Sequence, residues 1–335
     1  MKIAFFDTKD YDKTSFDLAN KDRQFSIQYY SDRLSEQNAY LAKDFDAVCC
    51  FVNDRLSLET LTQLASFGVK LIAMRCAGVN NIDLAAADKL GIVVVNVPRY
   101  SPEGVAEHTL ALILSLNRKV HKAYLRTKDY NFSLKGLMGF NMRDKVVGVI
   151  GMGAIGRNVA RLLRAFGCQV LAYDIRPNKA LEKELGVRFT ELSDIWAKSD
   201  IITLHCPLTD QTRHIISSDS IAKMKDGVMM INTSRGGLVD TAALINGIRA
   251  RKIGTVGLDV YEEETEYFFE DLTDEILDDQ VLLELLALPN VLVTSHQAFF
   301  TREALAEISK TTLENVNEFV EQKPFTFRVT APKGA

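Results

Sequence analysis

The chain has 335 residues, of which 47% are hydrophobic and 25% are charged, so its composition is that of an ordinary globular protein and excludes a disordered chain. Because this length exceeds what a single hydrophobic core usually supports, we expect two domains. The formal net charge is −4 and no basic cluster is visible, which argues against binding to nucleic acid or to a membrane surface.

The sequence carries no targeting or metal-binding signature. Its first segment, MKIAFFDTKDYDK, turns polar too soon for a signal peptide, and no apolar run approaches the ~20 residues of a membrane span. The five cysteines include no C-x-x-C pair and lie in or beside apolar runs, which indicates reduced, buried thiols. The five histidines lack metal-ligand spacing. We therefore expect a cytoplasmic protein without a metal site.

Residues 1–97 alternate between strand-like and helix-like segments, which predicts a parallel sheet covered by helices. The segment 98–104, PRYSPEG, breaks this pattern with two prolines and a glycine, and we interpret it as the first crossing between domains. Strands are expected at 2–7, 25–30, 47–52, 70–75 and 92–97, with polar or amphipathic stretches such as 56–66 and 83–90 between them.

A long helical stretch begins at Val105. Its sequence, VAEHTLALILSLNRKVHKAY, carries apolar residues almost continuously, which predicts burial against more than one surface. A subunit interface would supply the second surface. His108 lies within this run, and we expect it to be packed.

Residues 145–174 read as strand, glycine turn, helix and strand. Gly151, Gly153 and Gly156 have the G-x-G-x-x-G spacing of a dinucleotide site. In this fingerprint the first glycine permits the turn, the second lets pyrophosphate approach, and the third lets helix and sheet pack closely. Asp174 follows Gly151 by 23 residues, where an acid binds the ribose hydroxyls of NAD and repels the 2′-phosphate of NADP.

The alternation continues to the end of the chain and predicts a second doubly wound sheet. The amphipathic helix expected at 302–321 would return to cover the first sheet, and the acidic stretch 262–279 would be a solvated insertion. We therefore predict an α/β protein with a discontinuous, flavodoxin-like substrate domain (1–99 plus 300–335) and a Rossmann NAD-binding domain (100–299). The later strands are expected near 169–173, 187–190, 201–205, 228–232, 255–260 and 291–295.

Three chemically distinctive residues follow strands of the second sheet. Arg235 follows VMMINT, Glu264 follows TVGLDV, and His296 follows VLVTS. Ligands of open α/β sheets bind outside the carboxyl ends of the strands, so these side chains should share one edge with the glycine turn. His205 also lies at a strand end, and for it we favour a role in the cofactor pocket or in the structure.

These residue types meet the needs of hydride transfer between nicotinamide and a 2-keto or 2-hydroxy acid. A guanidinium binds a substrate carboxylate in a planar, bidentate way that an ammonium cannot match. A histidine can donate a proton to the carbonyl oxygen near neutral pH. A carboxylate bonded to the other imidazole nitrogen would stabilise the imidazolium. We therefore predict that Arg235, His296 and Glu264 have these three roles.

The segments GVIGMGAIG, LHCPLT, NTSRGGLVD, GLDVYEEE and TSHQAFFT resemble the D-isomer-specific 2-hydroxyacid dehydrogenase family over nearly the whole chain. Within that family, RCAGVNNID, VPRYSPEGVAEHTLALILSLNR, NFSLKGLMGF and EYFFEDLTDEILDD look most like the fermentative D-lactate dehydrogenases. Asn80 stands where many relatives carry Asp, and Thr265 where many carry Pro, so neither position supports a finer assignment.

The resemblance implies further roles. The family's catalytic Arg, Glu and His fall on Arg235, Glu264 and His296. A homodimer or homotetramer is implied, with a dimerisation helix near 102–120. The implied substrate-binding residues are Gly78, Val79, Tyr100, Arg235 and Phe299, and the candidate cofactor-binding residues are Gly151, Gly153, Ala154, Ile155, Gly156, Asp174, His205, Cys206, Pro207, Thr233, Ser234 and Asp259.

The sequence therefore predicts NADH-dependent, reversible reduction of pyruvate to D-lactate. One alternative is another D-2-hydroxyacid dehydrogenase, acting on glyoxylate, hydroxypyruvate or a longer 2-keto acid, because one methylene discriminates by only ~1 to 3 kcal/mol. Another is a non-catalytic protein that senses NADH, as corepressors similar to this family do. Turnover of NADH with any 2-keto acid would separate these two alternatives.

Overall fold

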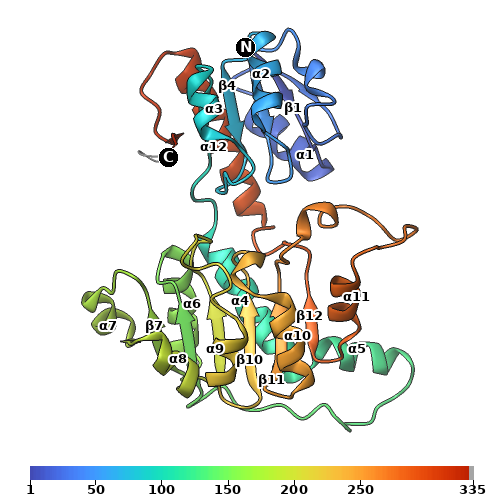
Figure 1. Cartoon of the computed structure of the whole chain (residues 1–335), viewed down its shortest axis with the longest axis vertical. Coiled ribbons are helices and arrows are strands. Elements are labelled where there is room, and N and C mark those ends of the chain that lie inside the picture. The colour runs from blue at the N-terminus through green and yellow to red at the C-terminus, as the bar shows by residue number, and fades with distance from the viewer. Residues whose placement is uncertain (332–335) are drawn as a thin grey trace. The chain divides into compact units, whose positions relative to one another are not determined.

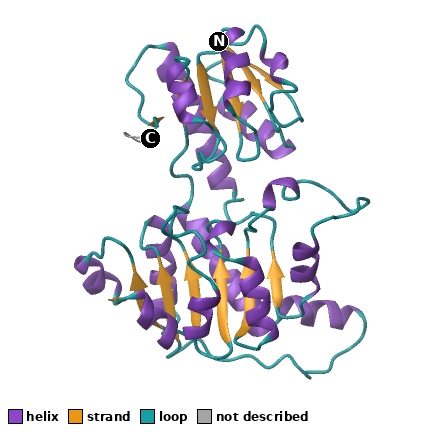
Figure 2. Cartoon of the chain, in the orientation of Figure 1, coloured by secondary structure: helices purple, strands orange, loops and turns teal. Residues whose placement is uncertain are grey.

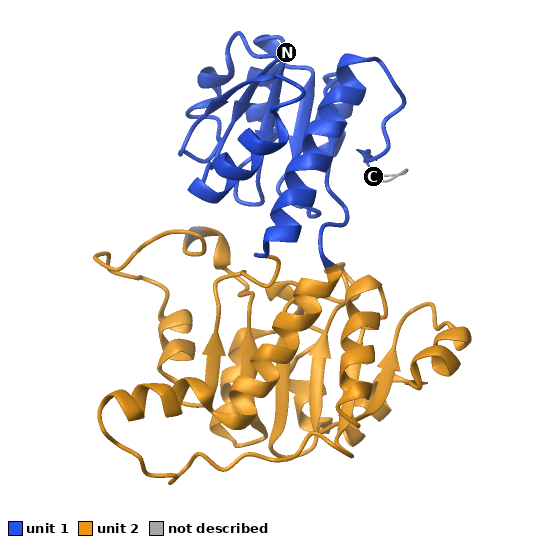
Figure 3. Cartoon of the chain, turned by 180° about the vertical axis from the view of Figure 1, so that it is seen from behind, with its two compact units in different colours: residues 1–101, 300–335 blue, residues 102–299 orange. Residues whose placement is uncertain are grey.

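The computed structural model describes residues 1–331, so the last four residues of the predicted 300–335 segment lie outside the described residues. The chain forms two compact units, one of Met1–Ser101 with Phe300–Ala335 and one of Pro102–Phe299 (Figure 3). The chain first crosses between the units at Ser101 and Pro102, inside the segment 98–104 that we interpret as the crossing. The domain boundary predicted from the sequence lay two residues earlier, between residues 99 and 100.

The first unit contains a six-stranded sheet in the order β13-β5-β4-β3-β1-β2. Its five longer strands are parallel and follow the flavodoxin-like order, whereas the short β13 pairs antiparallel with β5. The expected strands are therefore all present, and β13 is one that the sequence did not predict. The strands are β1 (Lys2–Phe5), β2 (Ser26–Tyr29), β3 (Ala47–Cys50), β4 (Leu71–Met74), β5 (Val93–Val95) and β13 (Arg328–Val329).

Helix α12 (Arg302–Val320) joins this unit although it lies more than 200 residues beyond β5 in the sequence. It packs on α1 and β4. The Ser15 hydroxyl of α1 donates to the Leu305 carbonyl (2.8 Å), and the Asn315 amide donates to the carbonyl of Asn96, which follows β5 (2.9 Å). The other helices of the unit are α1 (Asp10–Ala19), α2 (Leu58–Ser66), α3 (Leu84–Lys89) and the 3₁₀ helix η1 (Ala39–Ala42).

The second unit contains a seven-stranded parallel sheet in the order β12-β11-β10-β9-β6-β7-β8 (Figures 1 and 2). Strand order reverses between β6 and β9, which is the point where dinucleotides bind in a Rossmann fold. Two parallel α/β sheets were predicted, and this prediction is confirmed. The strands are β6 (Val146–Ile150), β7 (Gln169–Tyr173), β8 (Arg188–Phe189), β9 (Ile201–Leu204), β10 (Val228–Asn232), β11 (Ile253–Leu258) and β12 (Val291–Val293).

Helices cover both faces of this sheet and bury its central strands, β6, β9 and β10. One apolar cluster contains residues of β6 and β10 with α4 and α6, such as Val149, Ile231 and Leu163, and the other contains residues of β9 and β11 with α9 and α10. The helices are α4 (Pro102–Arg118), α5 (Val120–Lys128), α6 (Ala154–Ala165), α7 (Lys179–Leu185), α8 (Leu192–Lys198), α9 (Ser218–Lys223), α10 (Thr241–Arg249) and α11 (Gln280–Ala287), with the 3₁₀ helices η2 (Gly236–Leu238) and η3 (Glu264–Glu266).

The helical stretch that begins near Val105 is two helices rather than one. Lys119 adopts a left-handed conformation (φ +51°) between α4 and α5, and this interrupts the run of helical hydrogen bonds. Helix α4 is largely buried, whereas no residue of α5 is buried. Among the described helices, none combines the length and the apolarity needed to cross a membrane.

Candidate active site

The glycine turn joins β6 to α6, and its three glycines meet different surroundings. Gly151 has φ +94°, and a Cβ there would lie 2.5 Å from the backbone nitrogen of Cys206. A Cβ on Gly156 would lie 1.9 Å from the Gly151 carbonyl oxygen, whereas a Cβ on Gly153 would have nothing within 4 Å. The first and third glycines are therefore required by the protein's own packing. The second leaves open space, which fits a pyrophosphate group.

The start of α6 has the features of an anion-binding site. Gly153 is its N-cap and supplies no side-chain hydrogen bond, so the first N–H groups, including those of Ala154 and Ile155, have no partner within the helix. Such N–H groups and the positive end of the helix dipole favour a phosphate.

Asp174, at the end of β7, is held beside this turn. Its Oδ2 accepts from the backbone N–H of Met152 (2.8 Å), and its Oδ1 accepts from that of Arg176 (2.9 Å). The carboxylate therefore helps to fix the glycine turn. Its position at the end of the second strand is also the one expected of an acid that recognises ribose.

The segment after β9 lies against the same turn. His205 is half-buried, its Nε2 lies 2.9 Å from the Thr203 hydroxyl, and desolvation of the ring lowers its pKa to about 3, so the ring is neutral at physiological pH. Burial also raises the pKa of the Cys206 thiol to about 11. Cys206 and Pro207 continue this segment, and the Cys206 carbonyl accepts from the Ser234 hydroxyl (2.8 Å). A neutral His205 therefore supports the turn and cannot act as a proton donor near pH 7.

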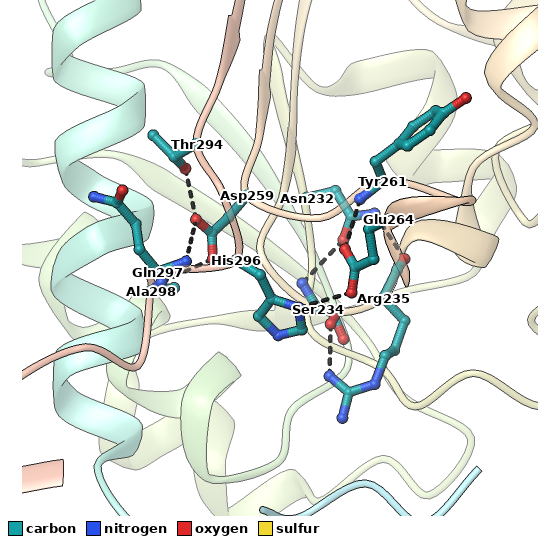
Figure 4. Close-up of polar contacts among 10 residues, drawn as sticks. All are labelled: Asn232, Ser234, Arg235, Asp259, Tyr261, Glu264, Thr294, His296, Gln297 and Ala298. Atoms are coloured by element: carbon teal, nitrogen blue, oxygen red, sulfur yellow. Dashed lines mark hydrogen bonds and ion pairs between the residues drawn. The ribbon is translucent and has the colours of Figure 1, made fainter. Parts of the chain in front are cut away.

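Arg235 follows β10 in a loop fixed by Asn232 (Figure 4). The Asn232 side chain donates to the Arg235 carbonyl (2.8 Å) and accepts from the Ser234 N–H (3.0 Å). The guanidinium donates through Nη1 to the Ser234 carbonyl (2.7 Å), which orients it and leaves other N–H groups for a ligand. The neighbouring Thr233 hydroxyl lies 2.9 Å from that of Thr109 in α4.

Gly236 brings this loop close to the segment that carries Glu264. A Cβ on Gly236 would lie 2.0 Å from the Tyr261 carbonyl oxygen, so only glycine allows the two backbones to approach in this way. The sequence reasoning missed Gly236, Asn232 and Tyr261. The only signal was their presence in NTSRGGLVD and GLDVYEEE, two of the segments that resemble the family, and such a resemblance cannot reveal a contact between backbones.

Glu264 and His296 form a hydrogen-bonded pair (Figure 4). Glu264 Oε1 lies 2.7 Å from His296 Nδ1, and Oε2 accepts from the Tyr261 N–H (2.9 Å). Because a carboxylate only accepts, Nδ1 is the donor and Nε2 is the nitrogen left for a substrate. Both side chains are about one-sixth exposed, so the pair is partly screened from water yet accessible.

Asp259 holds the turn that carries His296. Its buried carboxylate accepts from the Thr294 hydroxyl (2.5 Å) and from the N–H groups of Gln297 (2.9 Å) and Ala298 (2.8 Å), while its carbonyl accepts from the His296 N–H (2.7 Å). These contacts maintain the left-handed conformation of His296 (φ +52°). A role of Asp259 in cofactor binding stays a prediction.

His108 contributes to this arrangement, which its position within a helical run did not suggest. Its Nε2 lies 3.3 Å from Asp259 Oδ1 and 3.2 Å from the Thr294 hydroxyl. It is therefore a polar partner of the turn and not only a packed side chain. Helical periodicity could not reveal this partner, because it comes from two distant strand ends.

The remaining predicted residues belong to different units. Gly78 and Val79 follow β4 and Tyr100 precedes α4, all in the first unit, whereas Phe299 is buried at the end of the second. Their substrate-binding roles stay predictions. Within residues 1–331, no group of three or more His, Cys, Asp or Glu side chains has the arrangement of a metal site.

The fold and site define a class of protein. A nicotinamide-dependent dehydrogenase needs a dinucleotide site and a group that transfers a proton. The second unit has a glycine turn at the switch point of a Rossmann sheet and an acid after the second strand. At the same sheet edge it has an Arg and a His–Glu pair.

Comparison with known proteins specifies the family. The profile of "D-isomer specific 2-hydroxyacid dehydrogenase, NAD binding domain" matches residues 110–298. The chain is 51% identical to a "2-hydroxyacid dehydrogenase homolog" of Haemophilus influenzae (94% of this chain, 95% of that one) and 48% identical to the D-lactate dehydrogenase of Escherichia coli (95% and 96%). The apo structure of D-lactate dehydrogenase from Escherichia coli superposes with a TM-score of 0.90 at 44% identity, covering 98% of this chain and 100% of that one.

The chain therefore belongs to the D-isomer-specific 2-hydroxyacid dehydrogenase family, and it is an NAD-dependent enzyme of that family. The resemblance read from the sequence and the prediction of NAD as cofactor are confirmed.

Proposed function

We propose that this enzyme reduces pyruvate to D-lactate with NADH, reversibly. The observation that carries the proposal is the Glu264–His296 pair, with 2.7 Å between Oε1 and Nδ1, at the sheet edge that also holds Arg235 and the glycine turn. Similarity to the D-lactate dehydrogenase of Escherichia coli supports pyruvate as the substrate.

The cofactor would lie on the glycine turn. Gly153 and the first N–H groups of α6 would hold the pyrophosphate, and Asp174 the adenosine ribose. Thr233 and Ser234, at the end of β10, lie at the same sheet edge and would line the site. When bound, NADH supplies the hydride that arrives at the keto carbon of the substrate.

Three side chains would then carry the reaction. Arg235 binds the substrate carboxylate through two guanidinium N–H groups and so orients the keto carbon. Protonated His296 donates its Nε2 proton to the carbonyl oxygen, which becomes the hydroxyl of the product. Glu264 stabilises the imidazolium before transfer and keeps the ring in the required tautomer. In the reverse direction, neutral His296 accepts the hydroxyl proton.

The test is NADH oxidation with a panel of 2-keto acids, followed by chiral separation of the products. The panel contains pyruvate, glyoxylate, hydroxypyruvate and phenylpyruvate, and the matched control is His296→Gln. We expect the highest kcat/KM with pyruvate and D-lactate as product. A preference for another member would identify a different D-2-hydroxyacid dehydrogenase. No turnover with any member would overturn the proposal.

We also infer that the chain forms a homodimer or homotetramer. Exposed apolar side chains gather on α5 and in the segment after it, including Leu134 (81% exposed) and Met138 (87%), and such a surface is typical of an interface. The exposed surface of α5 and the segment after it is therefore a better candidate for the subunit interface than the dimerisation helix predicted near 102–120, because that helix is largely buried. Light scattering should give at least twice the monomer mass of 37.5 kDa, and the double variant Phe132→Glu, Leu134→Glu should lower it.

The proposed compartment is the cytoplasm. All five cysteines are buried and free, which suits a reducing environment.

A further inference from the structure

A second side chain of the acidic insertion contacts His296. The ring of Phe269 lies 5.8 Å from the imidazole, measured between centroids, with an angle of 35° between the planes. Glu264, five residues earlier, holds Nδ1 of the same imidazole. The short segment 264–269 therefore contacts the imidazole of His296 twice: Glu264 binds one edge of it, and the ring of Phe269 packs beside it.

The backbone of Phe269 is unusual for its residue type. It has φ +72°, in the left-handed region that bulky residues rarely adopt. Such a conformation persists only where the surrounding structure imposes it, and it is common at functional sites. The conformation indicates that the ring is directed by tertiary contacts and not by local preference.

The two residues immediately before Phe269 are held by contacts of their own. Phe268 is buried in the core cluster of the second unit, and its N–H donates to the Glu264 carbonyl (2.9 Å), as does that of Tyr267 (3.0 Å). The backbone of Glu264 is thereby tied to the residue that precedes Phe269. The two groups that contact His296 are consequently held as one structural element.

The far end of the insertion is held as well. The Tyr261 hydroxyl donates to Asp279 (2.7 Å), and Asp279 caps α11 by accepting from the N–H groups of Val281 and Leu282. Between these attachments the chain is largely exposed, and Ile276 has 91% of its surface exposed. The insertion is thus attached at both ends, and its first part is the part that contacts the imidazole.

We propose that Phe269 is a positioning residue for His296. The hydrogen bond from Glu264 restrains one edge of the imidazole, and the Phe269 ring restrains its plane, so that together they set the direction of Nε2. The apolar ring also excludes water from the side of the imidazole that it contacts. This inference rests on the proposed function, in which Nε2 donates the proton.

Three variants separate the ring from the backbone. Phe269→Ala removes the ring and keeps a strained residue, Phe269→Gly removes the ring and accepts positive φ without strain, and Phe269→Tyr keeps an aromatic ring. Ile276→Ala, in the exposed part of the same insertion, is the matched control. If backbone strain alone mattered, the kcat of the Gly variant would equal or exceed that of the wild type.

The first measurement is steady-state kinetics. We expect the Ala and Gly variants to lose about 10-fold to 100-fold in kcat with pyruvate, the scale of a small misplacement of a reacting group, while the KM for NADH changes less than about twofold. The Tyr variant should recover most of the loss, and the control should match the wild type. Unchanged kcat in the Ala and Gly variants, or an equal loss in the Tyr variant, would overturn the proposal.

The second measurement does not depend on turnover. The protein contains five histidines, so NMR of selectively labelled imidazoles yields five sets of signals, and His296→Gln identifies the one of interest. We expect Phe269→Ala to move the His296 signal, because the ring current of Phe269 is lost, and Phe269→Tyr to retain it. An unmoved signal overturns the inference. Inactivity of the wild type with every keto acid would instead overturn the proposed function, and the NMR result would still show whether the ring restrains His296.

Discussion

Glu264 Oε1 and His296 Nδ1 lie 2.7 Å apart, although 32 positions separate the two residues in the chain. The second oxygen of the carboxylate accepts from the Tyr261 N–H, so the carboxylate cannot rotate without breaking one of these bonds. The pair should therefore act as a unit in catalysis.

This unit leads to a prediction about non-additive losses. We expect His296→Gln to lower kcat about 10²-fold to 10⁴-fold, the usual contribution of a general acid, and Glu264→Gln to lower it by about 10-fold to 10²-fold. The double variant should be no worse than His296→Gln, because Glu264 acts only through the imidazole. Single-turnover kinetics checks this. Fully additive losses would show that Glu264 acts on the substrate independently.

Arg235 should be irreplaceable by lysine. The guanidinium is oriented by its bond to the Ser234 carbonyl, and lysine keeps the charge but not the planar pair of donors. We expect Arg235→Lys to lower kcat/KM for pyruvate by about 100-fold, equivalent to about 2.7 kcal/mol, chiefly through KM. Arg213→Lys, at an exposed arginine paired with Glu262, is the control and should match the wild type. An equal effect in both variants would argue against a carboxylate-binding role.

The glycine turn predicts opposite results for two similar substitutions. Gly153→Ala meets open space at φ −68°, so its unfolding free energy should stay within about 0.5 kcal/mol of the wild type, while the Kd for NADH rises about 10-fold or more. Gly156→Ala meets the Gly151 carbonyl oxygen and should cost about 3 kcal/mol of stability. Urea unfolding and fluorescence titration check the two effects. Unchanged NADH affinity in Gly153→Ala would place the pyrophosphate elsewhere.

Asp174 should contribute both charge and structure. Asp174→Asn keeps one acceptor oxygen but removes the charge that repels a 2′-phosphate, so the preference for NADH over NADPH should fall about 10-fold. Asp174→Ala should relax the preference similarly but also lose the bond to the Met152 N–H, which costs about 1 kcal/mol of stability. The ratio of kcat/KM for the two cofactors is the measurement. A wild-type preference for NADPH would contradict the assignment.

His205 should make stability fall in acid. Its pKa is about 3 in the folded protein, because the ring is buried, against an ordinary value of 6.5 in the unfolded chain. Below pH 6.5 the unfolded state therefore binds a proton that the folded state does not, so this stability is present above pH 6.5 and is lost progressively toward pH 3. Urea midpoints at pH 7.5 and pH 5 should differ less in His205→Gln than in the wild type. If the urea midpoint shifted equally between the two pH values in both proteins, other groups would be the cause of the acid sensitivity.

Much of the fold could be predicted because its signals are local. Apolar runs of strand length alternate with amphipathic segments, and the glycine spacing between β6 and α6 is contiguous, so short stretches are enough to recognise them. The break at Lys119 was missed because a left-handed residue between two helices leaves the apolar pattern intact. Strand β13 was missed because only two residues pair with β5.

The sequence by itself determined the α/β class, the glycine turn and the identity of the Arg, Glu and His that follow the strands, because each is a property of adjacent residues. Tertiary structure alone decided which atoms meet: Glu264 with His296, Gly236 with the Tyr261 carbonyl, His108 with Asp259, and Phe269 with the imidazole. The physical reason is that parallel strands bring their carboxyl ends to one edge from distant parts of the chain, and the backbone conformation of each connecting segment then sets the direction of every side chain.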